Sequence, residues 1–341
     1  MTERQRTFIV AEAGVNHNGS LEMARRLVEV AAEAGADAVK FQTFTAEKVV
    51  TAAAPKADYQ RATTESGESQ LEMIRKLELD NEAFRALAEH AAARGIEFMS
   101  TPFDIDAVGF LADTIGVKRL KIPSGEITNG PLLLAAARTG KPIILSTGMS
   151  TLDDVRAALA ILAFGYARPD DAPSRAAFEA ARESVEGQSA LREKVVLLHC
   201  TTEYPAPFAE VNLRAMDTMA QTFGLPVGYS DHTLGIEVAV AVVARGAVVV
   251  EKHFTLDCGL PGPDHAASLE PDELTAMVRE MEIDGLGYPP ALWKQMADLG
   301  WLGLALPEEY AGQGLPLTYL GLILEEAGRV LAPVPLHSTA V

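Results

Sequence analysis

The stretches VGYSDHT (residues 227–233) and VVVEKHFT (residues 248–255) are the starting point for the fold. Each begins as a short apolar strand and ends in polar residues with a histidine among them, His232 in the first and His253 in the second. Two imidazoles at the ends of neighbouring strands are suited to bind one divalent metal ion. One exposed histidine and one core histidine with no common role would give the same local pattern, so the rest of the chain has to decide.

Apolar runs of the same kind recur along the chain ahead of these two segments. They are FIVAEAG (8–14), AVKFQTF (38–44), EFMSTPF (97–103), RLKIPSGE (119–126), PIILSTG (142–148) and VVLLHCT (195–201). A helical pattern follows each run, as in residues 18–37, where Ser20 is the expected N-cap and Gly35 lies at the C-terminal end. Continuous apolar strands that alternate with helices are typical of parallel sheets that are buried on both faces.

Eight strand–helix units in a chain of 341 residues predict a closed (β/α)₈ barrel, the TIM barrel. The alternative is an open doubly wound sheet, which normally has a glycine-rich phosphate turn after its first strand. The corresponding turn in this chain, GVNHNGS (14–20), does not match that pattern. We therefore expect a TIM-barrel domain over residues 1–282, followed by a short α-helical tail over residues 283–341.

Composition restricts the classes of protein to which the chain can belong. The net charge of −18 argues against nonspecific nucleic-acid binding, although a local basic pocket could still bind an anionic substrate. No apolar run approaches the length of a membrane span, and MTERQRTF (1–8) lacks the apolar region of a signal peptide. Cys200 and Cys258 are expected to be free thiols in a reducing compartment. These features predict a cytoplasmic protein that binds neither nucleic acid nor membrane.

Polar residues gather at the C-terminal ends of the eight expected strands. They are Glu12, Lys40, Gln42, Thr101, Ser124, Glu126, Ser146, Thr147, Tyr204, Ser230, His232 and His253. In a TIM barrel these ends converge on one face, where the catalytic residues lie. Any one of these residues could have a structural role, but polar groups at the ends of all eight strands predict a functional site.

This set of side chains suits the binding of an anion beside a metal ion. Lys121 lies within the apolar strand RLKIPS, and a lysine there is costly to bury unless an anion pairs with it. Together with Lys40, Thr101, Ser124 and Ser146, it would form a cage for a phosphate and a carboxylate. A metal ion on the two histidines could polarise a carbonyl group as a Lewis acid.

Four carboxylates are candidates for proton handling or for orienting a sugar hydroxyl: Glu12, Glu126, Glu251 and Asp264. Glu251 lies two residues before His253 on the same strand and therefore shares its face. We expect Glu251 either beside the metal or, as the alternative, in an interstrand salt bridge.

The motifs around these positions resemble those of one known family. The chain resembles the sialic acid synthase family in AEAGVNHNG (11–19), VKFQTF (39–44), MSTPFD (99–104), KIPSGE (121–126), ILSTGM (144–149), HCTTEYPAP (199–207), GYSDHT (228–233), EKHFT (251–255) and PGPDH (261–265). The resemblance covers roughly residues 8–282 and includes every expected strand. It implies a TIM barrel that condenses phosphoenolpyruvate with an N-acetylated mannosamine-type sugar, giving a nonulosonic acid.

The resemblance also implies roles for individual residues. A divalent metal ion, Mn²⁺ or alternatively Mg²⁺, is expected on His232 and His253. Phosphoenolpyruvate is expected to contact Lys40, Lys121, Thr101, Ser124, Ser146 and Ser230. The positions that match the sugar site or the metal site are Glu12, Gln42, Tyr204 and Asp264. The expected assembly is a homodimer.

The chain departs from the common family pattern in two respects, and the first concerns the sugar. Where neuraminate-making members often have asparagine, this chain has Thr202, and it carries an inserted segment near residues 165–190. Both features resemble the legionaminate-type branch, so the sugar is either N-acetylmannosamine or a 2,4-diacetamido-trideoxy sugar. Thr202 is therefore included among the expected substrate-binding residues.

The second departure is the tail. Residues 283–341 resemble the N-terminal helical segment of acyl-CoA dehydrogenases, without the flavin-binding region, so no FAD is expected. Sialic acid synthases usually continue into an antifreeze-like cap domain, which we do not expect in this chain. Phosphoenolpyruvate and metal should then bind nearly normally, while sugar turnover is impaired. The alternatives are another phosphoenolpyruvate-dependent sugar synthase and a catalytically impaired chimera.

Overall fold

In the computed structural model, the residues described are 6–57, 60–61, 64, 67–281, 315–316, 318 and 322. The chain divides into two compact units, Met1–Val278 and Arg279–Val341, and nearly all described residues belong to the first. The helical tail expected over residues 283–341 lies almost entirely outside the described residues.

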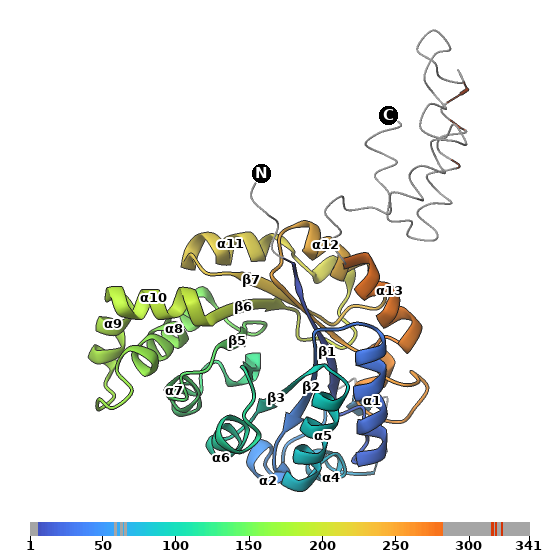
Figure 1. Cartoon of the computed structure of the whole chain (residues 1–341), viewed down its shortest axis with the longest axis horizontal. Helices are drawn as coiled ribbons and strands as arrows, with labels where there is room; N and C mark the ends of the chain where they lie inside the picture. The colour runs from blue at the N-terminus through green and yellow to red at the C-terminus, as the bar shows by residue number, and fades with distance from the viewer. Residues whose placement is uncertain are drawn as a thin grey trace. The chain divides into compact units, whose positions relative to one another are not determined.

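Eight parallel strands form the centre of the first unit (Figure 1). They are β1 (Phe8–Gly14), β2 (Ala38–Thr43), β3 (Glu97–Pro102), β4 (Leu120–Ile122), β5 (Ile143–Ser146), β6 (Val195–Cys200), β7 (Val227–Asp231) and β8 (Val249–His253). The hydrogen-bonded order is β3-β2-β1-β8-β7-β6-β5-β4. The end strands β3 and β4 also contact each other, so the sheet nearly closes on itself. This arrangement confirms the predicted TIM barrel.

The helices surround the sheet on its outer side (Figure 1). They are α1 (Leu21–Glu33), α2 (Ala46–Val49), α4 (Gln70–Arg75), α5 (Asn81–Ala93), α6 (Ile105–Gly109), α7 (Gly130–Arg138), α8 (Leu152–Ala167), α9 (Arg175–Glu183), α10 (Val185–Lys194), α11 (Arg214–Phe223), α12 (Glu237–Ala244) and α13 (Pro271–Met281). In α1, the Ser20 hydroxyl accepts from the backbone N–H of Met23, as the predicted N-cap should. The chain leaves α1 at Gly35, whose φ of +84° suits glycine.

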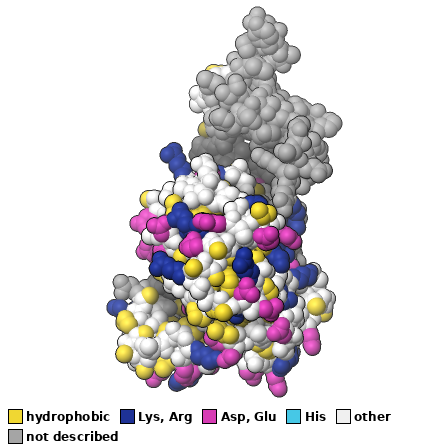
Figure 2. All heavy atoms as spheres, turned by 90° about the vertical axis from the view of Figure 1, so that its left-hand side faces the viewer, with side chains coloured by type: hydrophobic (Ala, Val, Ile, Leu, Met, Phe, Trp, Pro, Cys, Tyr) yellow, Lys and Arg dark blue, Asp and Glu magenta, His cyan; other side chains and the backbone are white. Residues whose placement is uncertain are grey.

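The charged insertion after α8 folds into two helices that pack against α8. Ser184 separates them, and its side chain caps α10 by accepting from the backbone N–H of Gly187. Phe178 of α9 contacts Phe164 of α8 edge-on, with ring centroids 5.2 Å apart. Acidic and basic side chains are interspersed over the side of the barrel that carries these helices, which shows no large area of one sign (Figure 2).

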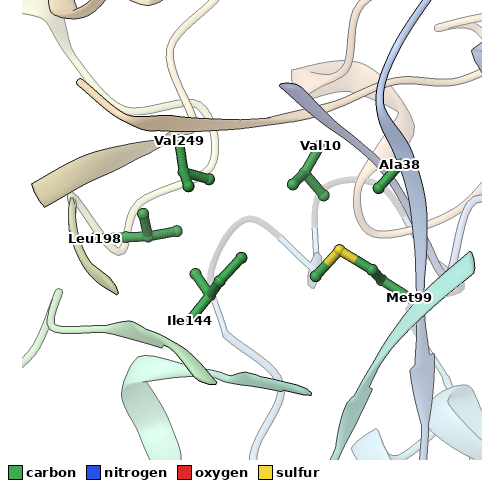
Figure 3. Close-up of a cluster of buried hydrophobic side chains, with 6 residues drawn as sticks. All are labelled: Val10, Ala38, Met99, Ile144, Leu198 and Val249. Atoms are coloured by element: carbon green, nitrogen blue, oxygen red, sulfur yellow. The ribbon is translucent and has the colours of Figure 1, made fainter. Parts of the chain in front are cut away.

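A layer of apolar side chains fills the inside of the barrel. Its members are Val10, Ala38, Met99, Ile144, Leu198 and Val249, which point toward one another from six different strands (Figure 3). Because side chains alternate along a strand, the next inward position lies two residues further on. In all six strands that next residue lines a polar cavity: Glu12, Lys40, Thr101, Ser146, Cys200 and Glu251. The barrel interior therefore changes from apolar to polar within one step toward the C-terminal ends.

Gly228 on β7 is packed too closely for any side chain. A Cβ atom at this position would lie 2.2 Å from the Val249 carbonyl oxygen and 2.8 Å from Leu198 Cδ2. We expect Gly228→Ala to reduce the free energy of unfolding by about 1–3 kcal/mol, measured by urea denaturation. Gly109→Ala is the control, because a Cβ there would meet no atom within 4 Å. Equal stability of Gly228→Ala and wild type would contradict this packing.

Candidate active site

One inward-facing residue from each strand contributes to a ring at the C-terminal end of the barrel, which we call the polar ring. Its members are Glu12, Lys40, Thr101, Lys121, Ser146, Cys200, Ser230 and Glu251, from β1 to β8 in order. They line a cavity of about 70 Å³, together with Gln42, Phe103, Pro123, Ser124, Tyr204, His232 and His253. The convergence predicted for the strand ends is therefore present.

Two lysines and two glutamates form an ion-pair network within the polar ring. Lys40 Nζ lies 2.7 Å from Glu12 Oε2 and 3.6 Å from Glu251 Oε2, and it donates to Thr101 Oγ1 at 3.0 Å. Lys121 Nζ donates to Glu251 Oε1 at 3.2 Å. All four charged side chains are at most 5% exposed, so no solvent screens them. Glu251 thus occupies the interstrand salt bridge that was one of its two expected positions.

Burial and the lysines act differently on the two carboxylates. Burial raises the pKa of the Glu12 carboxyl, although Lys40 opposes the shift. Burial acts on Glu251 in the same direction, but Lys121 and Lys40 outweigh it and hold the pKa of that carboxyl well below its usual value. Glu251 is therefore the charged counter-ion of both lysines, while Glu12 is suited to take up or release a proton.

Several buried polar atoms of this cavity have no hydrogen-bond partner in the part of the chain that the structure describes. Four of them are Glu12 Oε2, Ser146 Oγ, Glu251 Oε2 and His253 Nδ1. Glu12 Oε2 is close to the Lys40 ammonium, but the contact does not have the geometry of a hydrogen bond. Glu251 Oε2 likewise lies 3.6 Å from that ammonium. Of the four, only Ser146 Oγ and His253 Nδ1 lack both a hydrogen bond and an ion pair within the described part of the chain. Buried polar groups are rarely left unpaired, so these two atoms at one cavity indicate the place of a polar ligand.

The two histidines lie side by side at the cavity, with ring centroids 5.6 Å apart. His232 Nδ1 lies 2.5 Å from the Thr201 carbonyl oxygen, which can only accept, so Nδ1 carries the proton. The lone pair is then on Nε2, near Tyr204 Oη at 3.2 Å and Ser230 Oγ at 3.3 Å. Burial lowers the pKa of His232 to about 4 and that of His253 well below its ordinary value. Both imidazoles are therefore neutral, the form that binds metals.

This donor set fits a divalent metal ion with an incomplete protein shell. Among the described residues, no group of three or more His, Cys, Asp and Glu side chains is arranged to hold a metal. His232 and His253 would therefore supply two ligands, and water or substrate would supply the others. Open coordination positions are characteristic of catalytic rather than structural metal sites.

A second cavity of about 200 Å³ adjoins the first on its outer side. The two share Gln42, Phe103, Tyr204 and His253. The remainder of its wall is mainly apolar and consists of Val15, Phe44, Val49, Gln60, Met73, Ile74, Leu77, Pro263 and Asp264. Burial raises the pKa of the Asp264 carboxyl to about 6, so this group can exchange a proton near neutrality.

Comparison with known families places the chain in one of them. A family model described as the NeuB family matches residues 27–284, three quarters of the chain. The chain belongs to the NeuB family. As a NeuB-family member it is an enzyme of the nonulosonic acid synthase type.

Relatives with curated names match about four fifths of the chain. The N,N'-diacetyllegionaminic acid synthase of Campylobacter jejuni is 50% identical over 277 residues, which are 81% of this chain and 76% of the relative. The human N-acetylneuraminate-9-phosphate synthase is 35% identical over 285 residues, 83% of this chain and 72% of the relative. The crystal structure of the N-acetylneuraminic acid synthetase from Leptospira borgpetersenii is 33% identical, with a TM-score of 0.65, covering 82% of this chain and 83% of that one.

The C-terminal part matches a different family. A model described as the acyl-CoA dehydrogenase N-terminal domain matches residues 264–341, overlapping the end of the NeuB match. Within the described part of the chain, every helix is too short or too polar to cross a bilayer.

Most of the residues predicted for the NeuB-family site lie at the two cavities. Thr202 and Glu126 line neither of them: Thr202 is exposed, and Glu126 accepts a hydrogen bond from Asn129 Nδ2. The roles assigned to all of the predicted site residues stay predictions. Sequence reasoning missed Cys200 and Phe103, although Cys200 ends its strand as the other members of the polar ring do.

Proposed function

We propose that this NeuB-family enzyme condenses phosphoenolpyruvate with an N-acetylated mannosamine-type sugar, giving a nonulosonic acid and phosphate. The observation that carries the proposal is the polar ring, in which two buried lysines and the Ser146 hydroxyl, which makes no hydrogen bond within the described residues, surround one small cavity. We further propose that it acts in the cytoplasm as a homodimer, with residues 1–282 as the catalytic domain. Sedimentation of the full chain tests the dimer.

Phosphoenolpyruvate would bind in the inner cavity. Lys40 and Lys121 supply two cationic groups, and Ser146 offers a hydroxyl without a hydrogen-bond partner among the described residues. Thr101, Ser124 and Ser230 line the same cavity and complete the set of donors. Charge-assisted hydrogen bonds from ammonium groups to phosphate and carboxylate oxygens are among the strongest in proteins. Binding would draw each lysine partly away from its glutamate, which favours ligands that carry several negative charges.

His232 and His253 would hold the metal ion, and His253 lines both the inner and the outer cavity. When bound, Mn²⁺ or Mg²⁺ supplies Lewis-acid polarisation of the sugar carbonyl. The Tyr204 hydroxyl lies beside His232 Nε2 and lines both cavities, so it is placed to orient a substrate oxygen. Glu12 and Asp264 are the carboxyls best suited to proton transfer, since burial raises the pKa of each.

The outer cavity would bind the sugar. Its apolar wall favours a sugar that carries methyl groups, namely a 6-deoxy carbon and two acetamido methyls, over a fully hydroxylated one. A hydroxyl placed against Met73 or Leu77 would lose hydrogen bonds to water without replacement. The apolar wall thus favours a 2,4-diacetamido-2,4,6-trideoxy sugar over N-acetylmannosamine. The identity to N,N'-diacetyllegionaminic acid synthases supports the same choice.

The test is phosphate release from phosphoenolpyruvate in the presence of Mn²⁺ with a panel of sugars. We expect turnover with the diacetamido-trideoxy sugar, slower turnover with N-acetylmannosamine, and none with phosphorylated aldoses such as erythrose 4-phosphate. A preference for a phosphorylated aldose would identify a different phosphoenolpyruvate-dependent synthase. Absence of phosphate release with every sugar, despite binding of phosphoenolpyruvate and Mn²⁺, would identify an impaired enzyme.

A substitution at the rim of the outer cavity tests the sugar preference. Val49→Thr keeps the shape of a side chain that is 36% exposed and replaces one methyl group by a hydroxyl. We expect kcat/KM for the diacetamido-trideoxy sugar to fall by about tenfold, with unchanged affinity for phosphoenolpyruvate. Val185→Thr on α10, where the valine is 78% exposed, is the matched control and should behave as wild type. Equal kcat/KM values in all three proteins would remove Val49 from the sugar site.

A further inference from the structure

A fully buried ion pair lies next to the two histidines. Lys252 Nζ donates to Asp231 Oδ2 at 2.8 Å, and neither side chain has any exposed surface. Lys252 Nζ also donates to the Thr233 carbonyl oxygen at 2.5 Å. The other carboxylate oxygen, Asp231 Oδ1, accepts from the Thr233 amide at 2.9 Å and from its hydroxyl at 2.8 Å. Both carboxylate oxygens are therefore hydrogen-bonded.

The position of this pair in the sheet is specific. Asp231 and Lys252 are register partners and form the last paired position between β7 and β8. Each directly precedes one histidine, Asp231 before His232 and Lys252 before His253. Successive side chains point to opposite faces of a strand, so the ion pair lies on the far side of the barrel wall from the cavity. The pair joins the two strands at the point where the histidines enter the cavity.

The hydrogen bonds made by Asp231 and Lys252 restrain the two histidines in different ways. Asp231 and Thr233 flank His232 and bond to each other, which fixes the backbone on both sides of it. The Thr201 carbonyl holds the ring of His232 through Nδ1. His253 has no such bond, because its buried Nδ1 is without a hydrogen-bond partner. The position of its ring therefore depends on the backbone of β8, which Lys252 ties to β7.

Stability alone does not account for this ion pair. Removing two charges from water costs about as much as their attraction returns, and apolar residues of similar volume often stabilise a protein equally well. A charged pair differs from an apolar pair in that it fixes one distance and one direction. Such a constraint is useful where two side chains on adjacent strands must meet at a common ligand.

We propose that Asp231 and Lys252 are positioning residues that set the separation and the orientation of His232 and His253, and thereby the affinity for the metal ion. The inference rests on the proposed function, because it requires the two histidines to bind a metal. Groups that orient metal ligands commonly change metal affinity by about 10–100-fold when they are altered.

The test compares the full-length wild type with Asp231→Asn/Lys252→Met. This double variant removes both charges, retains the side-chain sizes and leaves no unpaired buried charge. Mn²⁺ and phosphoenolpyruvate are titrated separately into the metal-free proteins by calorimetry, well below the thermal midpoint of each. We expect the Kd for Mn²⁺ to rise by about 10–100-fold, while the Kd for phosphoenolpyruvate stays unchanged. Thr233→Val, which removes only the hydroxyl donor to Asp231, should weaken Mn²⁺ binding to a smaller extent.

The control removes an ion pair from the opposite end of the barrel. Arg119 Nε lies 2.8 Å from Glu97 Oε1, and Glu97→Gln/Arg119→Met should leave the Kd for Mn²⁺ unchanged. Wild-type Mn²⁺ affinity in the Asp231→Asn/Lys252→Met protein would overturn the inference and leave the metal assignment intact. Equal losses of Mn²⁺ and phosphoenolpyruvate affinity would also overturn it, because they indicate general loosening of the barrel. If the wild type itself binds no Mn²⁺, the metal assignment and the inference both fail.

Discussion

Replacing His232 and His253 together by alanine is expected to abolish Mn²⁺ binding and to reduce phosphate release by more than about 1,000-fold. Lewis-acid stabilisation of a developing charge contributes several kcal/mol to a transition state, and this variant removes both protein ligands. The measurements are the metal content after dialysis against Mn²⁺ and the rate of phosphate release. Unchanged metal content in the double variant would show that the assignment of these histidines is wrong.

The single variants separate metal binding from stability. His253 has a buried Nδ1 without a hydrogen-bond partner, so His253→Ala removes no hydrogen bond through that atom. His232→Ala leaves the Thr201 carbonyl oxygen unpaired and should therefore be the less stable of the two. His199→Ala is the matched control, because His199 bonds to the Val211 carbonyl oxygen and does not line the inner cavity. This control should retain Mn²⁺ and turnover.

Lys121→Met is expected to raise the Kd for phosphoenolpyruvate by about 10–150-fold. The loss of one charge-assisted hydrogen bond costs about 1.5–3 kcal/mol, and each 1.4 kcal/mol corresponds to a factor of ten. The effect has a second cause in this barrel: without Lys121, the charge of Glu251 is only partly balanced and repels an incoming anion. Calorimetric titration with phosphoenolpyruvate, in the absence of sugar, measures the change.

Two further variants make this result interpretable. Lys121→Met/Glu251→Gln removes the repulsion together with the lysine, so it should bind phosphoenolpyruvate more tightly than Lys121→Met but less tightly than the wild type. Lys118→Met is the matched control, because Lys118 is 76% exposed and lies just before the same strand. A solvent-screened surface charge contributes little to the binding energy, so the Kd of Lys118→Met for phosphoenolpyruvate should equal that of the wild type. Wild-type affinity in Lys121→Met would exclude this lysine from the anion site.

The strands could be predicted from sequence because each is buried on both faces and is therefore mainly apolar ahead of the polar residues at its C-terminal end. The run at residues 8–14 coincides with β1, and Ser20 caps the helix as expected. The helices α9 and α10 had no comparable signal. Their sequences are rich in charge and alanine, and they are held by packing on α8 through contacts such as Phe178 on Phe164. Such tertiary stabilisation leaves little trace in a local pattern.

The inner cavity could be anticipated because its residues come from strand ends, which a parallel barrel must bring together. Glu251 was assigned two alternative positions, because sequence fixes its strand face and not its neighbours across the barrel. The outer cavity could not be anticipated. Met73, Ile74 and Leu77 come from a stretch between β2 and α5 that has a largely polar composition, and Pro263 comes from the loop after β8. No periodicity links segments so far apart.

The apolar layer beneath the polar ring limits how ligands can enter and leave the inner cavity. Val10, Met99 and Leu198 are without exposed surface, so the axis of the barrel is plugged at this level. Among the described residues, the inner cavity therefore has its way out on the side of the outer one. A molecule bound in the outer cavity would therefore obstruct the release of a ligand from the inner cavity. If phosphoenolpyruvate binds in the inner cavity and the sugar in the outer one, as proposed, we expect phosphoenolpyruvate to bind first and the ligand left in the inner cavity to dissociate last.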